Sequence, residues 1–328
     1  METLILSNRD VAALLSHEEA IAMVDAVFKE WGNGNVVMPP KVNLDMSRSG
    51  FDSWSNAMPA YIASYNVGGI KWVGGYGSNP ARKLPYIVGI VVLTDPESGR
   101  TLSVMDGVYI SDWRTGASAA VASKYLAKDK VEKIAMVGAG AQGRTATACL
   151  HQVFPGAEIA VADISRERRQ AFRDEMIENF GIGVTDARTA EAAVTDADIV
   201  VLLTTAKEPI IKADWVGEGC VTLAMGSYQQ TEDKLILESD KIVVDCWSQA
   251  GHRGELKRLT ELGKVSEEDV YAELGFIAAG KKPGRNSQKE RIMAVLVGLG
   301  AHDVFIAGQV YKRAVARGVG QRVCLRQD

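Results

Sequence analysis

Several features are missing from this chain, and each absence excludes a class of protein. No apolar run approaches the ~20 residues that a membrane-spanning helix needs, so we expect no membrane segment. The opening residues, METLILSN, lack a basic stretch followed by a long apolar one, and a cytoplasmic location is therefore expected. The net charge of −4 supplies no basic field that would attract nucleic acid or an anionic membrane.

Cysteine and histidine are also scarce, with four of each in 328 residues. The cysteines form no C-x-x-C pair, and the histidines form no H-E-x-x-H or related pattern. We therefore predict no structural or catalytic metal. Cys149 lies in an expected helix, and Cys220 and Cys246 lie in apolar, strand-like stretches. We expect each of these thiols to pack as a small buried apolar group.

Hydrophobic periodicity predicts different structures in successive parts of the first half. Residues 9–31 have helical spacing, and Ser16 with Glu19 forms a capping box that starts the second of two helices. Between residues 36 and 93, short apolar segments broken by Gly, Pro, Asn and Ser indicate a largely antiparallel sheet. Residues 111–128 form an alanine-rich helix of high intrinsic propensity.

From residue 131 onward, strands and helices alternate, which predicts a Rossmann-type, doubly wound parallel sheet. The expected strands are 134–137, 159–162, 198–203, 220–224 and 241–245, and the expected helices are 144–153, 166–179 and 303–317. The fold class is therefore α/β, and the nucleotide-binding half follows a first part of a different, α+β kind.

The most informative segment is KIAMVGAGAQGR at 133–144, in which a buried strand runs into a G-x-G-x-x-G loop and then a helix. Gly138 permits the tight turn, and Gly140 lets the backbone approach a dinucleotide pyrophosphate. Gly143 lets the helix pack closely on the strand. The free N–H groups and the dipole of the helix N-terminus favour the anion, so the segment predicts a dinucleotide site.

An acidic residue, Asp163, ends the next strand about 20 residues after the third glycine, where a carboxylate accepts hydrogen bonds from the ribose hydroxyls. This position favours NAD over NADP. Arg166, Arg168 and Arg169 follow it and can hold a 2′-phosphate, so NADP stays open. In the alternative interpretation Asp163 is a turn residue and the arginines form the exposed face of a helix.

Three basic residues of the first half stand out: Lys41, Lys71 and Arg114. Lys71 lies within an apolar strand, where a lysine is costly unless it is paired or belongs to a site, and where desolvation lowers its pKa. Simple alternation would instead place Lys71 on the solvent face. Arg114 either clamps a carboxylate through two hydrogen bonds or is a surface arginine. Cations near a dinucleotide suggest an anionic substrate.

Three motifs together resemble the ornithine cyclodeaminase/mu-crystallin family. They are D-G-x-Y-x-x-x-x-R-T-G-A from Asp106, V-G-A-G-A-Q-G from Val137, and G-R-N-S from Gly284 followed by V-G-L-G-A-H-D. The resemblance covers nearly the whole chain. It implies an NAD(P)-dependent oxidoreductase of amino-acid metabolism that acts on the C–N bond of amino or imino acids, as an imino-acid (imine) reductase or an amino-acid dehydrogenase.

The same resemblance implies a domain organisation and an assembly. A substrate-binding and dimerisation domain would span 1–129, with 304–328 returning to it, and a Rossmann dinucleotide-binding domain would span 130–303. Two chains would pack their N-terminal sheets together as a homodimer.

Site residues are assigned by matching positions of the family's motifs. Lys71 and Arg114 match its catalytic lysine and its substrate-carboxylate arginine, and Lys41 stands where the family commonly has an arginine. The implied substrate-binding residues are Lys41, Met58, Lys71, Arg114, Tyr228 and Gly298. The implied cofactor-binding residues are Thr115, Gly138, Gly140, Ala141, Gln142, Asp163, Ser165, Arg166, Thr204, Thr205, Met225, Gly226, Ser227 and Asp303.

The chain departs from the family after Gly226. Ornithine cyclodeaminases have Gly-Gly-Asp-x-Pro here, whereas this chain has GSYQQ, with Tyr228 at the aspartate position. Without that carboxylate a dibasic amino acid loses its counter-charge and its candidate base, which favours a reductase or dehydrogenase. Cyclodeamination of ornithine or lysine by bound NAD, with Glu232 or Asp233 substituting, is the alternative. A non-enzymatic, mu-crystallin-like role in binding a small ligand is another.

Overall fold

The computed structural model describes residues 2–47 and 50–325. The chain divides into two compact units, the first comprising Met1–Arg114 and Leu299–Asp328 and the second Thr115–Gly298. The expected domain boundaries at 129 and 303 lie further along the chain than the divisions after Arg114 and Gly298, and they stay a prediction. The α/β fold class is confirmed, because the second unit is built on a parallel sheet and the first on a separate sheet of mixed direction.

The first unit's sheet has the strand order β16–β1–β7–β6–β5–β4–β2, with β3 also paired to β4. Only β1 and β7 pair in parallel among these described strands, so the predicted antiparallel character is confirmed. Its strands are β1 (Glu2–Leu6), β2 (Val36–Val37), β3 (Val42–Asp45), β4 (Ser53–Ile62), β5 (Val67–Tyr76), β6 (Ile87–Thr94), β7 (Thr101–Asp106) and β16 (Gln321–Cys324). The short strands β1 and β16, of which β16 forms the edge of the sheet, were not predicted from the sequence.

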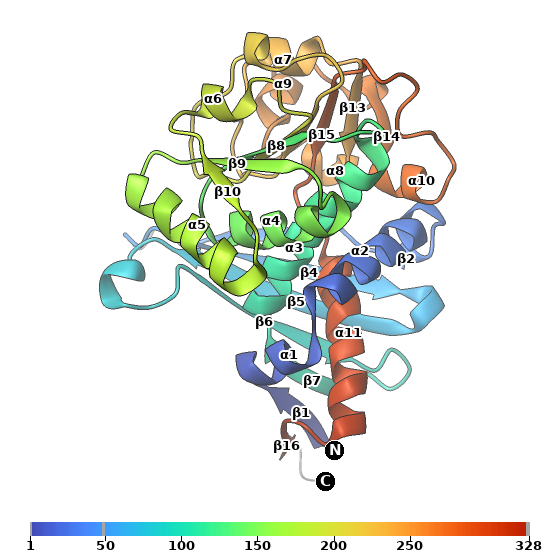
Figure 1. Ribbon diagram of the computed structural model, residues 1–328. Coiled ribbons are helices and arrows are strands. Elements are labelled where there is room, and N and C mark those ends of the chain that lie inside the picture. Colours follow the sequence, from blue (N-terminus) through green and yellow to red (C-terminus); the bar gives the residue numbers. More distant parts are fainter. Residues whose placement is uncertain (1, 48–49, 326–328) are drawn as a thin grey trace. The chain divides into compact units, whose positions relative to one another are not determined.

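Helices cover one face of this sheet. The unit contains α1 (Asn8–Leu14), α2 (His17–Gly32), the start of α3 (Val108–Leu126) and α11 (Gly300–Arg317). Helix α11 packs along β4, β5 and β6, and α2 packs on α11 (Figure 1). The predicted capping box at Ser16 and Glu19 is confirmed, and α11 begins at Gly300 instead of the expected residue 303.

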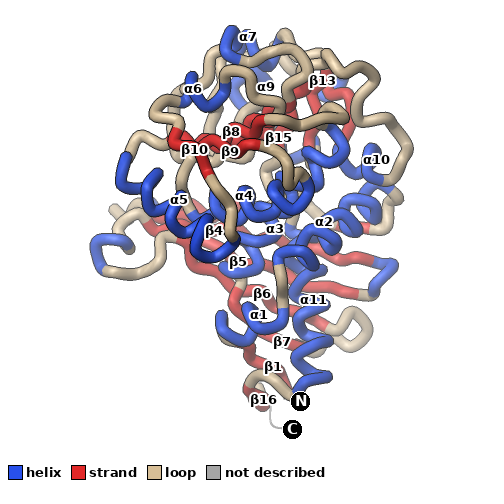
Figure 2. Tube along the Cα trace, in the orientation of Figure 1, coloured by secondary structure: helices blue, strands red, loops and turns tan. Residues whose placement is uncertain are grey.

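The second unit's sheet is entirely parallel, with the strand order β10–β9–β8–β11–β12–β15–β13–β14. Figure 2 shows its strands in red, with helices in blue around them. Its strands are β8 (Lys133–Val137), β9 (Glu158–Ala162), β10 (Val184–Asp186), β11 (Ile199–Leu202), β12 (Val221–Ala224), β13 (Lys241–Val244), β14 (Val270–Glu273) and β15 (Ile292–Val295). The five strands predicted here are confirmed to within two residues. Strands β10, β14 and β15 were missed, because segments of three or four residues are too short for their periodicity to distinguish a strand from another structure.

The helices of the second unit follow the predicted alternation. They are the remainder of α3, α4 (Ala141–Val153), α5 (Arg166–Phe180), α6 (Ala190–Val194), α7 (Asp233–Leu237), α8 (Trp247–Ala250), α9 (Lys257–Glu261) and α10 (Leu274–Ala278). Within this unit, Gly116 of α3 lies so close to the backbone of Thr145 and Ala146 in α4 that a β-carbon would overlap it. The predicted burial of Cys149, Cys220 and Cys246 is also confirmed.

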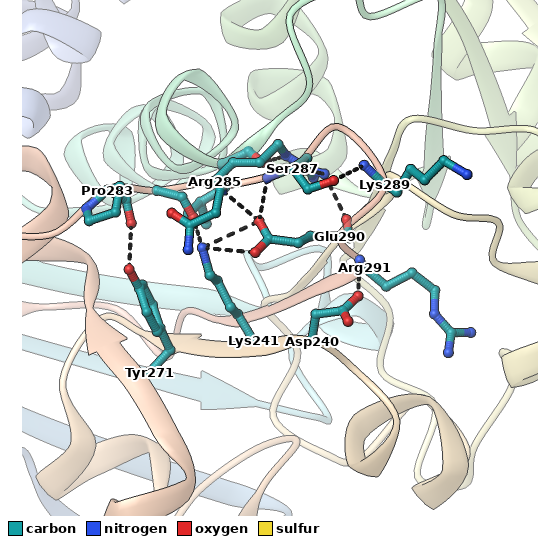
Figure 3. A network of polar contacts seen from close by, with 12 residues as sticks. Asp240, Lys241, Tyr271, Pro283, Arg285, Ser287, Lys289, Glu290 and Arg291 are labelled. Carbon is teal, nitrogen blue, oxygen red and sulfur yellow. Dashed lines mark hydrogen bonds and ion pairs between the residues drawn. The ribbon is translucent and has the colours of Figure 1, made fainter.

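Polar contacts hold the long loop before β15 (Figure 3). The buried Lys241 ammonium lies 3.2 Å from Glu290 Oε1, and Tyr271 donates a hydrogen bond to the carbonyl of Pro283. Arg285 donates to the carbonyls of Leu126, Ser287, Glu290 and Gly219. The G-R-N-S motif, which begins at Gly284, therefore joins the end of α3 to the parallel sheet.

Candidate active site

Lys71 lies at the centre of β5 and faces the interior of the first unit. Its cross-strand neighbours are Met58 on β4 and Val91 on β6, both of which are buried. The Lys71 side chain is only 1% exposed. Of the two interpretations that alternation allowed, the structure therefore selects the buried face, because α11 packs on that side of β5.

The Lys71 ammonium meets a cluster of polar groups from α3 and α11. Its Nζ lies 2.8 Å from Asp303 Oδ1 and donates to Ser111 Oγ at 3.1 Å. Arg114 Nε donates to the same Asp303 oxygen at 3.3 Å, and Ser111 Oγ donates to it at 3.4 Å. Arg114 is thus a largely buried, ion-paired residue of this cluster and not an ordinary surface arginine.

The charges of the cluster set the protonation of Lys71. Burial, followed by the nearby Arg114 guanidinium, lowers the pKa of Lys71 to about 8, against the opposing effects of Asp303 and Asp112. The two cations outweigh burial at Asp303 and hold the pKa of its carboxyl below the usual value. Lys71 and Arg114 share the Asp303 carboxylate, and their cationic N–H groups are donors suited to an anion.

Sequence reasoning missed two members of this cluster. Ser111 precedes Arg114 by three residues, a helical spacing that puts both on one face of α3 and was a usable signal. Asp112 is largely buried beside them, and burial raises its pKa to about 6 although Arg114 opposes the shift. Asp303 was predicted to bind the cofactor; the structure places it against Lys71 and Arg114, and the cofactor role stays a prediction.

The other predicted substrate residues of the first unit lie near in the strand register. Half-buried Lys41 directly precedes β3, whose first residue, Val42, pairs with Ala57 on β4. The next residue of β4, Met58, pairs with Lys71 on β5.

The glycine loop has the backbone that its sequence predicts. Gly138 has a φ of 115°, and a β-carbon there would overlap the carbonyl oxygen of Leu203. A β-carbon at Gly143 would overlap the carbonyl oxygen of Gly138. Gly140 is the N-cap of α4 and faces open space, with no atom within 4 Å of a β-carbon added there. Open space at the N-terminus of α4 fits the pyrophosphate of a dinucleotide.

The cofactor residues predicted beside Gly140 follow the strands β8 and β9. Ala141 and Gln142 form the first turn of α4. Asp163 follows β9 and accepts hydrogen bonds from the backbone N–H groups of Ala139 at 3.0 Å and Ser165 at 2.9 Å. Its position after the strand that follows the glycine loop fits recognition of a ribose.

The arginines that left NADP open have different surroundings. Arg169 is buried, pairs with Asp186 at 2.5 Å and donates to the Asp163 carbonyl at 2.7 Å, so its guanidinium is already engaged. Arg166, the first residue of α5, and Arg168 are exposed. Ser165 caps the same helix by accepting a hydrogen bond from the Arg168 N–H.

The loop that departs from the family follows β12, and polar contacts hold it beside the loop that follows β11. Gln230 Nε2 donates to the carbonyl and the hydroxyl of Thr204 at 2.8 Å and 2.6 Å. The buried Glu255 carboxylate accepts from the backbone N–H groups of Gln230 and Thr231. Tyr228 is exposed, with the Lys207 ammonium 6.0 Å from the centre of its ring.

The remaining predicted residues also belong to the second unit. Half-buried Met225 and Gly226 directly follow β12, and Thr205 and Ser227 are exposed on the two neighbouring loops. Thr115 is buried in α3. The Gly298 N–H donates to buried Asp245 at 2.7 Å.

The described residues also bear on metal binding and on membrane insertion. Within residues 2–47 and 50–325, His, Cys, Asp and Glu side chains form no group of three suited to a metal ion, and the absence of a metal stays a prediction. Over the same residues, every helix falls short of the length and apolarity needed to cross a bilayer.

Comparison with known proteins places this arrangement in a family. A family model described as ornithine cyclodeaminase/mu-crystallin matches residues 1–318. Alanine dehydrogenase of Archaeoglobus fulgidus is 35% identical over 326 residues, which cover 98% of both chains.

Two solved structures are similar over the full length. An archaeal alanine dehydrogenase dimer with bound NAD has a TM-score of 0.93 at 34% identity, covering 99% of this chain and 100% of the other. The Thermococcus litoralis Delta(1)-pyrroline-2-carboxylate reductase, in complex with NADH and L-proline, has a TM-score of 0.92 at 30% identity, covering 98% and 100%. The chain therefore belongs to the ornithine cyclodeaminase/mu-crystallin family.

Proposed function

We propose that this protein is an NAD-dependent oxidoreductase acting on the C–N bond of a small amino or imino acid, as an imino-acid reductase or an amino-acid dehydrogenase. The observation that carries the proposal is the buried Lys71 ammonium beside Arg114. A pKa of about 8 lets this lysine give up or take a proton close to neutral pH. The similar proteins are named for reactions at such a bond, as alanine dehydrogenase and pyrroline-2-carboxylate reductase.

Each residue of the cluster has a defined task in this proposal. Arg114, helped by Lys41, binds the α-carboxylate of the substrate through charge-assisted hydrogen bonds. Lysine at position 41 keeps the charge but lacks the planar fork of arginine, so its contact is less strict in geometry. Carboxylate binding fixes the position of the reacting carbon and nitrogen, which supplies much of the rate acceleration.

Lys71 handles the proton at the substrate nitrogen. The nicotinamide cofactor, when bound, would donate a hydride to the C=N carbon as NADH in reduction and would accept one as NAD⁺ in oxidation. During reduction the C=N electron pair moves to nitrogen, and that nitrogen takes a proton from the Lys71 ammonium. During oxidation the neutral amine of Lys71 takes the proton from nitrogen.

Features of the second unit support NAD as the cofactor. The open space at Gly140 admits the pyrophosphate, and Asp163 offers a carboxylate to the ribose. A 2′-phosphate beside that carboxylate would be repelled, and Arg169 is already paired with Asp186. NAD is therefore favoured over NADP.

Cyclodeamination has less support in the loop after β12. Tyr228 occupies the position of the family's aspartate, and the two nearby acids have other partners. Glu232 accepts a hydrogen bond from the Ala213 N–H, and Asp233 pairs with Arg258 and accepts from Gln229. A carboxylate from this loop would have to break those contacts to serve a dibasic substrate.

A homodimer and a cytoplasmic location complete the proposal. Trp72, Ile90 and Val88 are exposed on one face of the first unit's sheet, because Trp72 pairs with Ile90 and the neighbouring Gly74 pairs with Val88. An apolar face of this kind suits a second copy of the chain, and the similar archaeal alanine dehydrogenase is a dimer. Cell fractionation followed by immunodetection tests the location.

The decisive experiment combines a substrate panel with one variant. Purified protein is assayed with NAD(H) and NADP(H) on pyruvate and glyoxylate with amines, cyclic imines, ornithine and lysine. Lys71→Met should abolish turnover and leave NADH binding unchanged, because the glycine loop is untouched. Lys29→Met, a change on the surface of α2 where Lys29 pairs with Asp25, is the matched control.

Other outcomes identify the alternatives. Full activity in Lys71→Met would refute the assignment. Ammonia release from ornithine or lysine without a net change in NADH absorbance would establish cyclodeamination. Failure to oxidise or reduce a nicotinamide with every member of the panel would favour a ligand-binding role.

A further inference from the structure

One carboxylate oxygen in the cluster receives hydrogen-bond donors from three side chains. Asp303 Oδ1 lies within 2.8 to 3.4 Å of Lys71 Nζ, Arg114 Nε and Ser111 Oγ, which come from β5 and α3. Asp303 itself is fully buried in the first turn of α11. A buried carboxylate is costly unless it is paired, and two neighbouring buried cations repel one another unless an anion separates them.

The hydrogen bonds of Lys71 use two of the three N–H groups of its ammonium. An ammonium carries three N–H donors. Among the described residues, Lys71 directs two of them to Asp303 Oδ1 and Ser111 Oγ. With two directions fixed, the third N–H group has a defined direction as well.

We propose that Asp303 is a positioning residue: together with Ser111 it fixes two N–H groups of Lys71, so that the third is the one passed to the substrate nitrogen, and it holds Arg114 at the same point. This inference rests on the proposed role of Lys71 as the proton donor. Asp303 remains ionised and exchanges no proton with the substrate, because Lys71 and Arg114 keep the pKa of its carboxyl low.

The charged groups around Lys71 set its pKa, so the proposal can be tested by the pH dependence of the reaction rate. Arg114 and Asp112 face it from α3, and Asp303 and His302 from α11. Burial lowers the pKa of His302 to about 3, so this imidazole is neutral when Lys71 titrates near pH 8. Loss of the Asp303 charge therefore leaves Lys71 beside Arg114 with less compensation, and its proton becomes more acidic.

The test compares kcat for imine reduction across pH in four variants. Asp303→Asn should lower kcat at pH 7 about 100-fold, as expected for a misplaced catalytic group, and move the alkaline decline at least one pH unit lower. Ser111→Ala should lower kcat about tenfold, and Ser111→Thr, which keeps the hydroxyl, should restore it. Asp25→Asn, a carboxylate-to-amide change on α2, should leave the profile unchanged.

The outcomes separate this inference from the proposed function. If Lys71→Met is inactive while Asp303→Asn keeps kcat within threefold and the same alkaline decline, the positioning role is wrong and the proposed function stands. If Lys71→Met is fully active, the proposed function itself fails. Should Asp303→Asn not fold, the Ser111 pair decides: an unchanged kcat in Ser111→Ala overturns the proposal, and a loss restored by Ser111→Thr supports it.

Discussion

The Asp163 carboxylate accepts a hydrogen bond from the Ala139 N–H at 3.0 Å, which ties the end of β9 to the glycine loop that follows β8. The residue predicted to recognise the ribose therefore also supports the loop predicted to hold the pyrophosphate. Changes at this position should alter both the affinity for the cofactor and the choice between NAD and NADP.

Replacement of Asp163 by Asn tests that choice. A hydrogen bond to a charged acceptor contributes about 1.5–3 kcal/mol, so the KM for NAD should rise about 10- to 100-fold. The KM for NADP should change less, because the repulsion of its 2′-phosphate is removed at the same time. Steady-state kinetics with both cofactors measure the ratio, and an unchanged ratio would contradict a role for Asp163 in the selection of NAD.

Two glycines of the loop should respond differently to the same substitution. Gly138→Ala should lower the free energy of unfolding by about 1–3 kcal/mol, since its φ of 115° is strained for alanine and the new β-carbon meets Leu203. Gly140→Ala has space for the methyl group and should keep its thermal stability, but the methyl group occupies the expected path of the pyrophosphate. Thermal unfolding and NADH fluorescence titration distinguish the two. Normal NADH binding by Gly140→Ala would exclude a close approach of the cofactor there.

Asp112 should influence the pH dependence of catalysis. With a pKa of about 6, its carboxyl is ionised when Lys71 titrates near pH 8, and its negative charge raises the pKa of Lys71. Imine reduction needs protonated Lys71, so its rate should fall as the pH rises through about 8, whereas amine oxidation should rise over the same range. Asp112→Asn removes the negative charge and should move both transitions to lower pH. A shift to higher pH would show that Asp112 does not act through this charge.

The apolar sheet face gives a prediction about assembly. Trp72→Arg places a charge among Trp72, Ile90 and Val88, and it should convert a dimer into a folded monomer because burial of an unpaired charge is costly. Trp72→Phe keeps the apolar character and should remain dimeric. Light scattering coupled to size-exclusion chromatography measures the mass. A dimer that survives Trp72→Arg would assign the interface to another surface.

Local patterns determined much of the second unit from the sequence. The glycines at 138, 140 and 143 constrain the backbone directly, because their conformation and close contacts depend on the absence of a side chain. The alternation of strands and helices along the chain likewise predicted a parallel sheet, because it is a local pattern that does not depend on which strands pair. The capping box at Ser16 and Glu19 was readable for the same reason, since all of its groups lie within four residues.

Tertiary structure alone decided the chemistry around Lys71. Alternation along β5 defines two faces, but only the packing of α11 against the sheet determines which of them is buried. Asp303 lies far from Lys71 in the sequence, so no local pattern could reveal that its carboxylate joins Lys71 to Arg114. The sequence by itself determined a nucleotide-binding fold and named the two cations. Only the folded chain brings Lys71 and Arg114 to the shared Asp303 carboxylate. Desolvation and charge pairing depend on distances in space and not on separation along the chain.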